Sequence, residues 1–242
     1  LLILNTYRVL MRNLRDVQNP FETSEAQFIK NFRMPQVAIT KKLIEILRPY
    51  DTQSYSTIPF HIKVLAALNF FATGSYQTPV GRSNILNLSQ PAMSRIIADI
   101  RYLIVRHLHG VIKFPKTTRE VEAKTEEFRQ QFGIDNTIGC IDCTHIAIVA
   151  PSYTDPLQVC DANLKFLAIN ARFPGSTHDS GIWAMSRIRK RMQDLSNQHG
   201  VRLLGDSGYP LEPWLLTPYS HPEESWQHDF NKSHIQCRNV VE

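Results

Sequence analysis

Leu203-Leu-Gly-Asp-Ser-Gly-Tyr-Pro210 is the stretch that decides the fold of this 242-residue sequence. An apolar pair leads into Asp206, glycines lie on both sides of that acid, and a proline ends the segment. This pattern predicts a strand over residues 202–209 that ends at a turn and presents the Asp206 carboxylate there.

The tetrapeptide Gly205-Asp-Ser-Gly208 is also the nucleophile signature of chymotrypsin-like proteases. Such a protease would need a preceding His and Asp, an all-β double barrel and a backbone oxyanion hole. Half of this sequence has helical periodicity instead, and Tyr209 stands where that signature usually has another glycine. The surroundings therefore favour a chemical role for Asp206 over one for Ser207.

Three strands are predicted before this stretch. Thr137-Ile-Gly-Cys-Ile141 has the pattern of a buried strand that ends on Asp142, and the chain continues extended to Val149. Residues 157–161 and 164–172 form the next two strands, with hairpin chemistry in the Asp-Ala-Asn turn between them. We expect the three to form an antiparallel meander.

Helices and one more strand complete the order. A helix follows Pro174-Gly175 with Ser176 or Thr177 as its cap, and its predicted inner face is Met185, Ile188, Met192 and Leu195. A fifth strand is predicted over residues 214–218. A polar loop then leads to a helix from Ile235 that stops at Glu242. This order is that of an α/β (α+β) ribonuclease H-like mixed sheet with helices.

Four acids meet in that topology. The ends of the first and fourth strands lie side by side, so Asp142 and Asp206 would face each other, and Asp179 and Glu242 on two helices would converge on the same edge. Carboxylates this close repel unless a cation lies between them. Hard divalent cations prefer such oxygen ligands, which predicts a Mg²⁺ or Mn²⁺ site suited to phosphodiester cleavage with two metals. Alternatively, Asp142 bonds to backbone at a strand bend and Asp179 only caps a helix.

The first half of the chain differs in charge from the second. Residues 1–118 hold 15 Lys and Arg against 6 Asp and Glu, a net charge of +9, and residues 119–242 hold 12 against 16, a net charge of −4. A basic half suggests binding to a polyanion such as DNA, although a solvated basic helical surface would give the same count.

Helical periodicity dominates residues 1–118. A charged helix is predicted over residues 119–132, and it connects this first part to residues 133–242, which contain the predicted sheet and the four acids. A helix over 58–72, a short helix within 80–86 and a helix capped by Ser89 resemble a helix-turn-helix. Gln90, Ser94 and Arg95 would then approach the bases of DNA. The alternative is an ordinary packed helical region.

Composition also limits which other classes of protein this sequence can belong to. No apolar run approaches the ~20 residues of a membrane-spanning helix, so we expect no membrane association. The four cysteines are too few for a disulfide framework. Cys140 and Cys143 could suggest zinc, but positions three apart in a strand face opposite sides. The sequence lacks an initial Met and ends at Glu242, so we expect a fragment whose last helix is cut short.

Four segments in order resemble the PIF/Harbinger transposases, and especially the domesticated Harbinger transposase-derived nucleases of animals. They are Ile138-Gly-Cys-Ile-Asp-Cys-Thr-His-Ile146, Arg172-Phe-Pro-Gly-Ser-Thr-His-Asp-Ser180, Leu203-Leu-Gly-Asp-Ser-Gly-Tyr-Pro210 and Arg238-Asn-Val-Val-Glu242. The helical segments Phe71-Ala-Thr-Gly-Ser-Tyr76 and Leu88-Ser-Gln-Pro-Ala-Met-Ser-Arg95 are also similar to the part that precedes the catalytic domain in that family.

The resemblance implies a metal-dependent endonuclease of the Asp-Asp-Glu type. By it, Asp142, Asp206 and Glu242 are catalytic, and these three with Asp179 bind Mg²⁺ or Mn²⁺. Motifs leave open whether Asp179 or Asp206 is the second acid of the triad, and topology favours Asp206. The resemblance also implies a DNA substrate, a Myb-like nuclear partner, and a location in nucleus and cytoplasm.

Two departures from the family pattern support an alternative function. The family's Asn-Arg-Lys-Gly-type segment before the second strand is missing here, since Tyr153-Thr-Asp-Pro156 runs directly into Leu157. The helix that should carry Glu242 also stops at that residue. The alternative is a catalytically decayed DNA-binding protein that retains the transposase fold.

Overall fold

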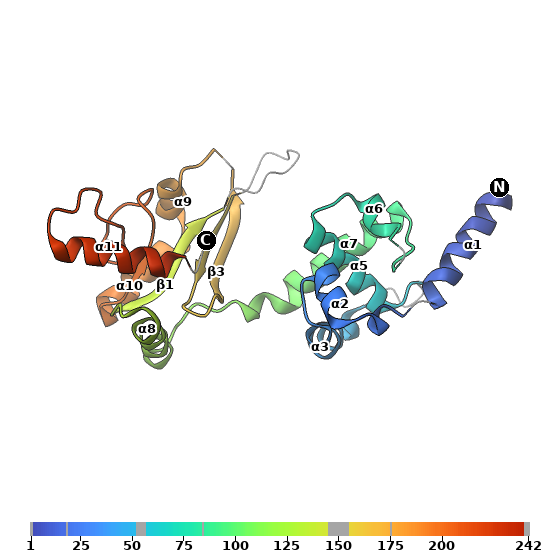
Figure 1. Ribbon diagram of the computed structural model, residues 1–242, viewed down its shortest axis with the longest axis horizontal. Coiled ribbons are helices and arrows are strands. Elements are labelled where there is room, and N and C mark those ends of the chain that lie inside the picture. Colours follow the sequence, from blue (N-terminus) through green and yellow to red (C-terminus); the bar gives the residue numbers. More distant parts are fainter. Residues whose placement is uncertain are drawn as a thin grey trace. The chain divides into compact units, whose positions relative to one another are not determined.

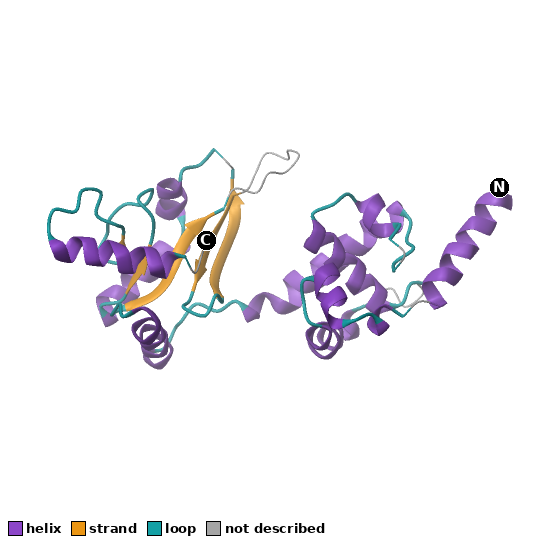
Figure 2. Cartoon of the chain, in the orientation of Figure 1, coloured by secondary structure: helices purple, strands orange, loops and turns teal. Residues whose placement is uncertain are grey.

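A computed structural model describes residues 2–17, 19–51, 57–83, 85–144, 155–174 and 176–239 (Figure 1). The chain divides into two compact units, residues 1–110 and 111–242. The first is helical and the second combines a sheet with helices (Figure 2). Among the described residues, none of the helices combines the length and apolarity that crossing a membrane requires.

The first unit consists of short and long helices joined by tight turns. Its α-helices are α1 (Leu2–Val17), α2 (Glu25–Phe32), α3 (Gln36–Ala38), α4 (Glu45–Leu47), α5 (Phe60–Thr73), α6 (Gln77–Gly81) and α7 (Gln90–Leu108). Single turns of 3₁₀ helix are η1 (Pro20–Glu22), η3 (Arg48–Tyr50) and η4 (His109–Val111), and η2 (Ile39–Ile44) is a π-helical segment.

Local signals place the ends of these helices. The Ser24 side chain caps α2, and Gly74 ends α5 in the left-handed conformation at φ 60°. Residues 36–47 are helical throughout, with the π-helical segment between α3 and α4. The short helix expected within residues 80–86 lies earlier, at α6.

The core of this unit centres on α5, which is buried on almost every side from Phe60 to Leu68. Met93, Ile96, Ile100 and Leu103 of α7 pack into the same core, as their spacing predicts. Phe71 was expected on the buried stripe, but 47% of it is exposed. It lies in the last turn of α5, beyond the turns that the neighbouring helices surround.

The second unit is built on a five-stranded mixed sheet. Its strands are β1 (Thr137–Cys143), β2 (Asp155–Cys160), β3 (Phe166–Phe173), β4 (Arg202–Leu204) and β5 (Leu215–Leu216), in the spatial order β3-β2-β1-β4-β5. The meander β1-β2-β3 is antiparallel, and β4 and β5 are parallel to their neighbours. The meander is thus confirmed, whereas the extended chain expected up to Val149 falls partly on residues 145–154, outside the described residues.

Helices cover both faces of this sheet: α8 (Thr118–Phe132), α9 (Asp179–Met185), α10 (Arg187–His199) and α11 (Ser225–Arg238) (Figure 1). Ile141 of β1 packs in a core with Trp183 of α9 and Met192 of α10. Cys140, the next residue along β1, packs instead in a core with Cys237 of α11. The strand alternation therefore separates an α9–α10 face from an α11 face.

Three sequence expectations about these helices are wrong. The single helix after Pro174 is two helices, because Ser186 is extended between them and caps α10. Met185 is therefore 63% exposed rather than on the inner face. The last helix starts at Ser225, ten residues before the expected Ile235, with a capping box between Glu224 and Gln227. His178, rather than Ser176 or Thr177, precedes the first helical residue, Asp179.

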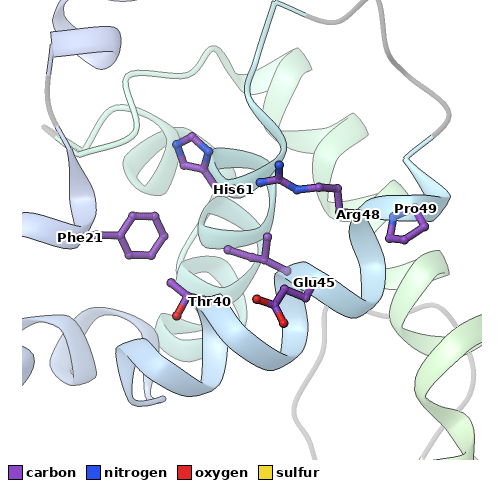
Figure 3. Close-up of a pocket in the computed structure, with 7 residues that line it drawn as sticks. Phe21, Thr40, Glu45, Arg48, Pro49 and His61 are labelled. Carbon is purple, nitrogen blue, oxygen red and sulfur yellow. The ribbon is translucent and has the colours of Figure 1, made fainter.

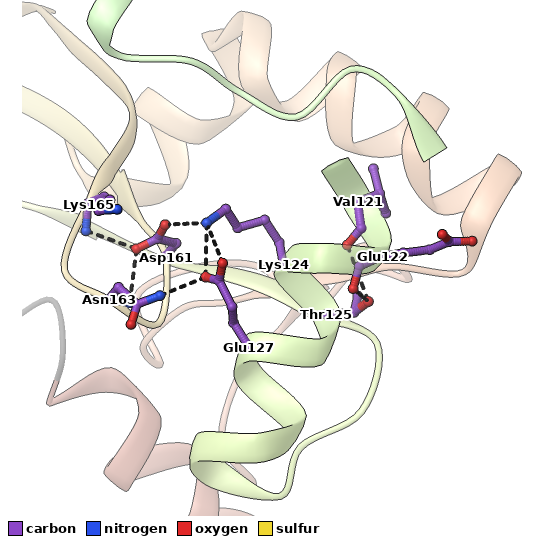
Figure 4. A network of polar contacts seen from close by, with 8 residues as sticks. All are labelled: Val121, Glu122, Lys124, Thr125, Glu127, Asp161, Asn163 and Lys165. Carbon is purple, nitrogen blue, oxygen red and sulfur yellow. Dashed lines mark hydrogen bonds and ion pairs between the residues drawn. The ribbon is translucent and has the colours of Figure 1, made fainter. Parts of the chain in front are cut away.

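A buried carboxylate anchors the β2–β3 turn to α8 (Figure 4). Only 1% of Asp161 is exposed, and its side chain accepts a 2.7 Å bond from Lys124 Nζ and bonds of 2.9 Å from the backbone N–H groups of Asn163 and Lys165. Glu127 bonds both Lys124 and Asn163 from the other side. Every oxygen of Asp161 thus has a short bond to a donor, and this satisfies a buried charge.

Candidate active site

The parallel pairing of β1 with β4 brings two aspartates to one edge of the sheet. Cys140 pairs with Leu204, so Asp142 and Asp206, each two residues further along, leave the two strands side by side. Side chains two apart in a strand share a face. Asp142 thus lies on the face of Cys140, which is the α11 face of the sheet.

Arg238, the final residue of α11, reaches both carboxylates. Its Nη2 lies 3.4 Å from Asp142 Oδ1 and 3.9 Å from Asp206 Oδ2. Burial raises the pKa of Asp142, the Arg238 charge works against that rise, and the nearby charges of Asp206 and Asp179 add to it. The edge therefore holds more negative charge than one arginine neutralises.

The glycines on either side of Asp206 lie so close to other atoms that a side chain at either position would crowd them. Gly208 N–H donates a 2.8 Å bond to Asp206 Oδ1, which orients Oδ2 toward Arg238. A Cβ on Gly208 would lie 3.0 Å from Asp206 Oδ1 and 3.7 Å from Asp179 Oδ2. A Cβ on Gly205 would lie 3.0–3.2 Å from atoms of Tyr209, Ile141 and Leu215. Neither glycine has a positive φ, so close approach is what requires glycine here.

Asp179 approaches the same edge from the first turn of α9. It lies beside Cys143, whose thiol accepts a 3.1 Å bond from the Tyr209 hydroxyl. Burial raises the pKa of Cys143 to about 12, and Asp179 and Asp142 add to the rise. The thiol is therefore protonated at physiological pH in the metal-free protein. All four cysteines lie within the described residues and are free thiols.

The donor set suits a hard cation, because it consists of carboxylate oxygens from β1, the end of β4 and α9. Glu242, the fourth acid predicted for this set, lies outside the described residues. Within the described ranges, no three or more His, Cys, Asp or Glu side chains are grouped closely enough to hold a metal ion. Asp142 and Asp206 therefore make the core of the candidate site, with Asp179 beside them.

The predicted DNA-contacting residues lie in the first unit, at the start of α7. Gln90, Ser94 and Arg95 are all exposed. Gln90 Nε2 donates a 2.8 Å bond to Gln77 Oε1 on α6, and Arg95 Nε donates a 3.2 Å bond to the Pro91 carbonyl. The three side chains lie on the solvent side of the helix, opposite Met93 and Ile96.

A pocket of about 520 Å³ opens elsewhere on the first unit (Figure 3). It is lined by Phe21, Thr40, Ile44, Glu45, Arg48, Pro49 and His61. Burial lowers the pKa of His61, and the charge of Arg48 lowers it further. None of these residues was singled out from the sequence, because they come from three separate segments with no shared motif.

Four basic residues, Arg187, Arg189, Lys190 and Arg191, lie close together on α10, and Arg189 has a structural role. Arg189 makes bonds of 2.7 and 2.9 Å to Glu212 Oε1, and Trp183 Nε1 donates a 3.0 Å bond to Glu212 Oε2. Arg189 is therefore committed to holding the β4–β5 connection against α9 and α10, whereas Arg187 and Lys190 are exposed.

Sequence reasoning missed the role of Arg238. The residue was quoted in Arg238-Asn-Val-Val-Glu242, but only the glutamate was assigned a function. The signal was the helix predicted over residues 235–242, in which positions four apart, such as Arg238 and Glu242, would face the same side.

Comparisons with known proteins show a similarity to nucleases. Residues 141–242 match the family model described as DDE superfamily endonuclease. The chain is 32% identical over 218 residues to "Putative nuclease HARBI1" of Bos taurus and 31% identical over 218 residues to the Homo sapiens protein of that name. Each alignment covers 83% of this chain and 61% of the relative.

A plant protein is also similar. "Protein ALP1-like" of Arabidopsis thaliana is 29% identical over 210 residues, which is 74% of this chain and 50% of that protein. The chain thus spans between 50% and 61% of the length of these relatives. No solved structure matches it significantly.

Proposed function

We propose that the chain hydrolyses DNA phosphodiester bonds at Asp142, Asp206 and Glu242, because residues 141–242 match the DDE superfamily endonuclease family and the chain is similar to Harbinger-derived nucleases. The observation that carries the proposal is the juxtaposition of Asp142 and Asp206 across parallel strands. The strand order β3-β2-β1-β4-β5 supports a ribonuclease H-like domain.

In this proposal, Mg²⁺ or Mn²⁺ held by Asp142, Asp206, Asp179 and Glu242 would activate water and stabilise the leaving 3′-oxygen. The chain's own contribution is to hold the ligands in place. The sheet fixes the Asp142 and Asp206 backbones, and Gly208 N–H orients the Asp206 carboxylate. Burial on the α11 face strengthens the attraction of these carboxylates for a cation.

Cleavage of supercoiled plasmid DNA tests the function. We expect nicking that requires Mg²⁺ or Mn²⁺ and that falls by at least about 100-fold in Asp142→Asn and in Asp206→Asn, because each removes a metal ligand. Arg189→Gln, which alters a structural contact on another part of the unit, serves as the control and should cleave at the wild-type rate. Cleavage that survives both aspartate substitutions would contradict the proposal.

The same assay assigns the second acid of the triad. We propose Asp206, with Asp179 as the auxiliary ligand on α9. Asp179→Asn should therefore reduce cleavage less than Asp206→Asn does. The reverse order would make Asp179 the second acid.

The second candidate is a DNA-binding protein without nuclease activity. The observation in its favour is that the described residues form no group of three metal ligands. DNA binding without cleavage at any Mg²⁺ or Mn²⁺ concentration would establish it.

DNA binding by the first unit is proposed to use a helix-turn-helix-like arrangement of α5, α6 and α7. The exposure of Gln90, Ser94 and Arg95 supports it. Arg95→Ala should weaken DNA binding and lower the slope of log affinity against log salt concentration by about 1, as expected for the loss of one phosphate contact. An unchanged slope would argue against this surface. A Myb-like partner and a nuclear and cytoplasmic location stay predictions from family resemblance.

A further inference from the structure

The guanidinium of Arg238 lies between two carboxylates that are proposed to bind a metal. A single nitrogen, Nη2, approaches Oδ1 of Asp142 at 3.4 Å and Oδ2 of Asp206 at 3.9 Å. A direct charge-assisted bond would be about 2.7–2.9 Å. The Arg238 guanidinium thus contacts both carboxylates, but at distances too long for a tight bond to either.

The surroundings hold Arg238 in this position. Its side chain is only 12% exposed, and its helix is fixed to the sheet through Cys237, whose carbonyl accepts a 3.4 Å bond from the Cys140 thiol. The Asp206 carboxylate is held in turn by the Gly208 N–H. Arg238 is therefore held by packing, whereas Asp206 lies in the turn after β4, with 34% of its side chain exposed, and is oriented by the Gly208 N–H.

We infer that Arg238 is an internal counter-ion of the acidic site: it holds Asp142 and Asp206 together in the absence of metal, and a divalent cation must displace it to bind them. This inference rests on the proposed function, because it takes the two aspartates to be metal ligands.

The positive charges of Arg238 and of a divalent cation indicate that the two compete for the carboxylates of Asp142 and Asp206. A divalent cation needs direct contact with the oxygens that Nη2 faces, about 2.0–2.6 Å away. A guanidinium remaining beside it would repel it, and guanidinium groups stay charged at every physiological pH. Arg238 is therefore expected to weaken metal binding and to stabilise the metal-free fold.

The opposite result is expected of a purely structural arginine. Loss of a structural contact loosens the two ligands and weakens metal binding. Loss of a competing cation strengthens it. The direction of the change in metal affinity separates the two roles.

The test is a Mn²⁺ titration of the 242-residue chain without DNA, with free Mn²⁺ followed by electron paramagnetic resonance. We expect Arg238→Gln, which keeps a polar hydrogen-bonding group on a shorter side chain and removes the charge, to bind Mn²⁺ at least about tenfold more tightly than wild type. Arg238→Lys keeps the charge and should stay within about threefold of wild type. The metal-free Arg238→Gln protein should unfold at a lower temperature, and saturating Mn²⁺ should raise its midpoint by more than it raises that of the wild type.

Asp206→Asn separates the two hypotheses. If Mn²⁺ binding depends on Asp206 and tightens in Arg238→Gln, both are supported. If binding depends on Asp206 but is unchanged or weaker in Arg238→Gln, the role of Arg238 is overturned and the metal site stands. If neither wild type nor Arg238→Gln shows binding that depends on Asp206, both fall.

Discussion

Two groups of carboxylates lie toward opposite ends of β1, and they are satisfied in different ways. Asp161, toward the start of the strand, has three donors within 2.7–2.9 Å (Figure 4). Asp142 and Asp206, beside its end, share one arginine nitrogen at 3.4 and 3.9 Å, and Asp206 has in addition one short bond, 2.8 Å from the Gly208 N–H. The first group is closed, with short bonds to protein donors. The second is open, with negative charge that a cation from solvent could neutralise.

The difference teaches how to separate structural acids from functional ones in this fold. Both groups contain an aspartate that a strand pattern places next to apolar residues, so the sequence pattern alone says little about function. The groups differ in burial, since 1% of the Asp161 side chain is exposed against 19% for Asp142 and 34% for Asp206. They also differ in the number and length of the bonds from protein donors.

The largest expected loss of stability comes from a substitution in the closed group, the one around Asp161. Asp161→Ala removes the partner of Lys124 and the acceptor for two backbone N–H groups, so we expect it to lower the free energy of unfolding by about 3 kcal/mol. Urea denaturation measures this. Asp142→Asn in the same assay without metal should change stability by less than about 1 kcal/mol, because it relieves repulsion at the open group. A larger loss in Asp142→Asn than in Asp161→Ala would refute the distinction.

The next effect concerns the space around the open group. Gly205→Ala places a methyl group 3.0–3.2 Å from Tyr209, Ile141 and Leu215, so we expect a loss of about 1–3 kcal/mol. Gly110→Ala is the control, because a Cβ there meets no atom within 4 Å. Thermal unfolding compares the two. A neutral Gly205→Ala would show that the site has room to relax, and it would weaken the case that Asp206 is rigidly placed.

A third, smaller effect tests the rule on another carboxylate. Glu212 resembles the closed group, with Arg189 and Trp183 as donors. Burial has the largest single influence on its pKa and raises it, but the hydrogen bonds from Arg189 and Trp183, with the Arg189 charge, together lower the pKa. Its contribution to stability is therefore present at neutral pH and is lost as the pH falls below about 4.5.

We expect Glu212→Gln to lower the free energy of unfolding at pH 7 by about 1 kcal/mol, and the difference from wild type to shrink at pH 4 and below. Denaturation at both pH values measures it. Glu126→Gln is the matched control, since Glu126 pairs with Arg129 on the exposed side of α8 and should leave stability unchanged within error. A difference that grows at low pH would mean that Glu212 is not held as a charged acceptor.

Much of the sheet could be predicted from sequence, because each strand carries its own signal. Apolar runs that end on Asp142 and Asp206 gave their positions, and the known order of strands then put the two acids together. The strand after Pro213 shows the limit. Only Leu215 and Leu216 pair with β4, although the pattern extended further.

Errors came from elements whose signals were weak or absent. The start of α11 is polar and capped by a glutamate, so its residues resembled a loop. Ser186 breaks a run that looked continuous, and nothing in the periodicity of the flanking residues marks the break. The contact of Arg238 with Asp142 spans 96 residues, and local sequence cannot specify a contact between such distant positions.

That separation also orders events in time. A ribosome adds about 5–20 residues per second, so Arg238 emerges roughly 5–20 seconds after Asp142. Until α11 has been made and has docked, the two aspartates lack the arginine that neutralises them. The nascent chain therefore passes through a stage in which its acidic edge is uncovered, and divalent cations in the cell would have their freest access to the site at that stage.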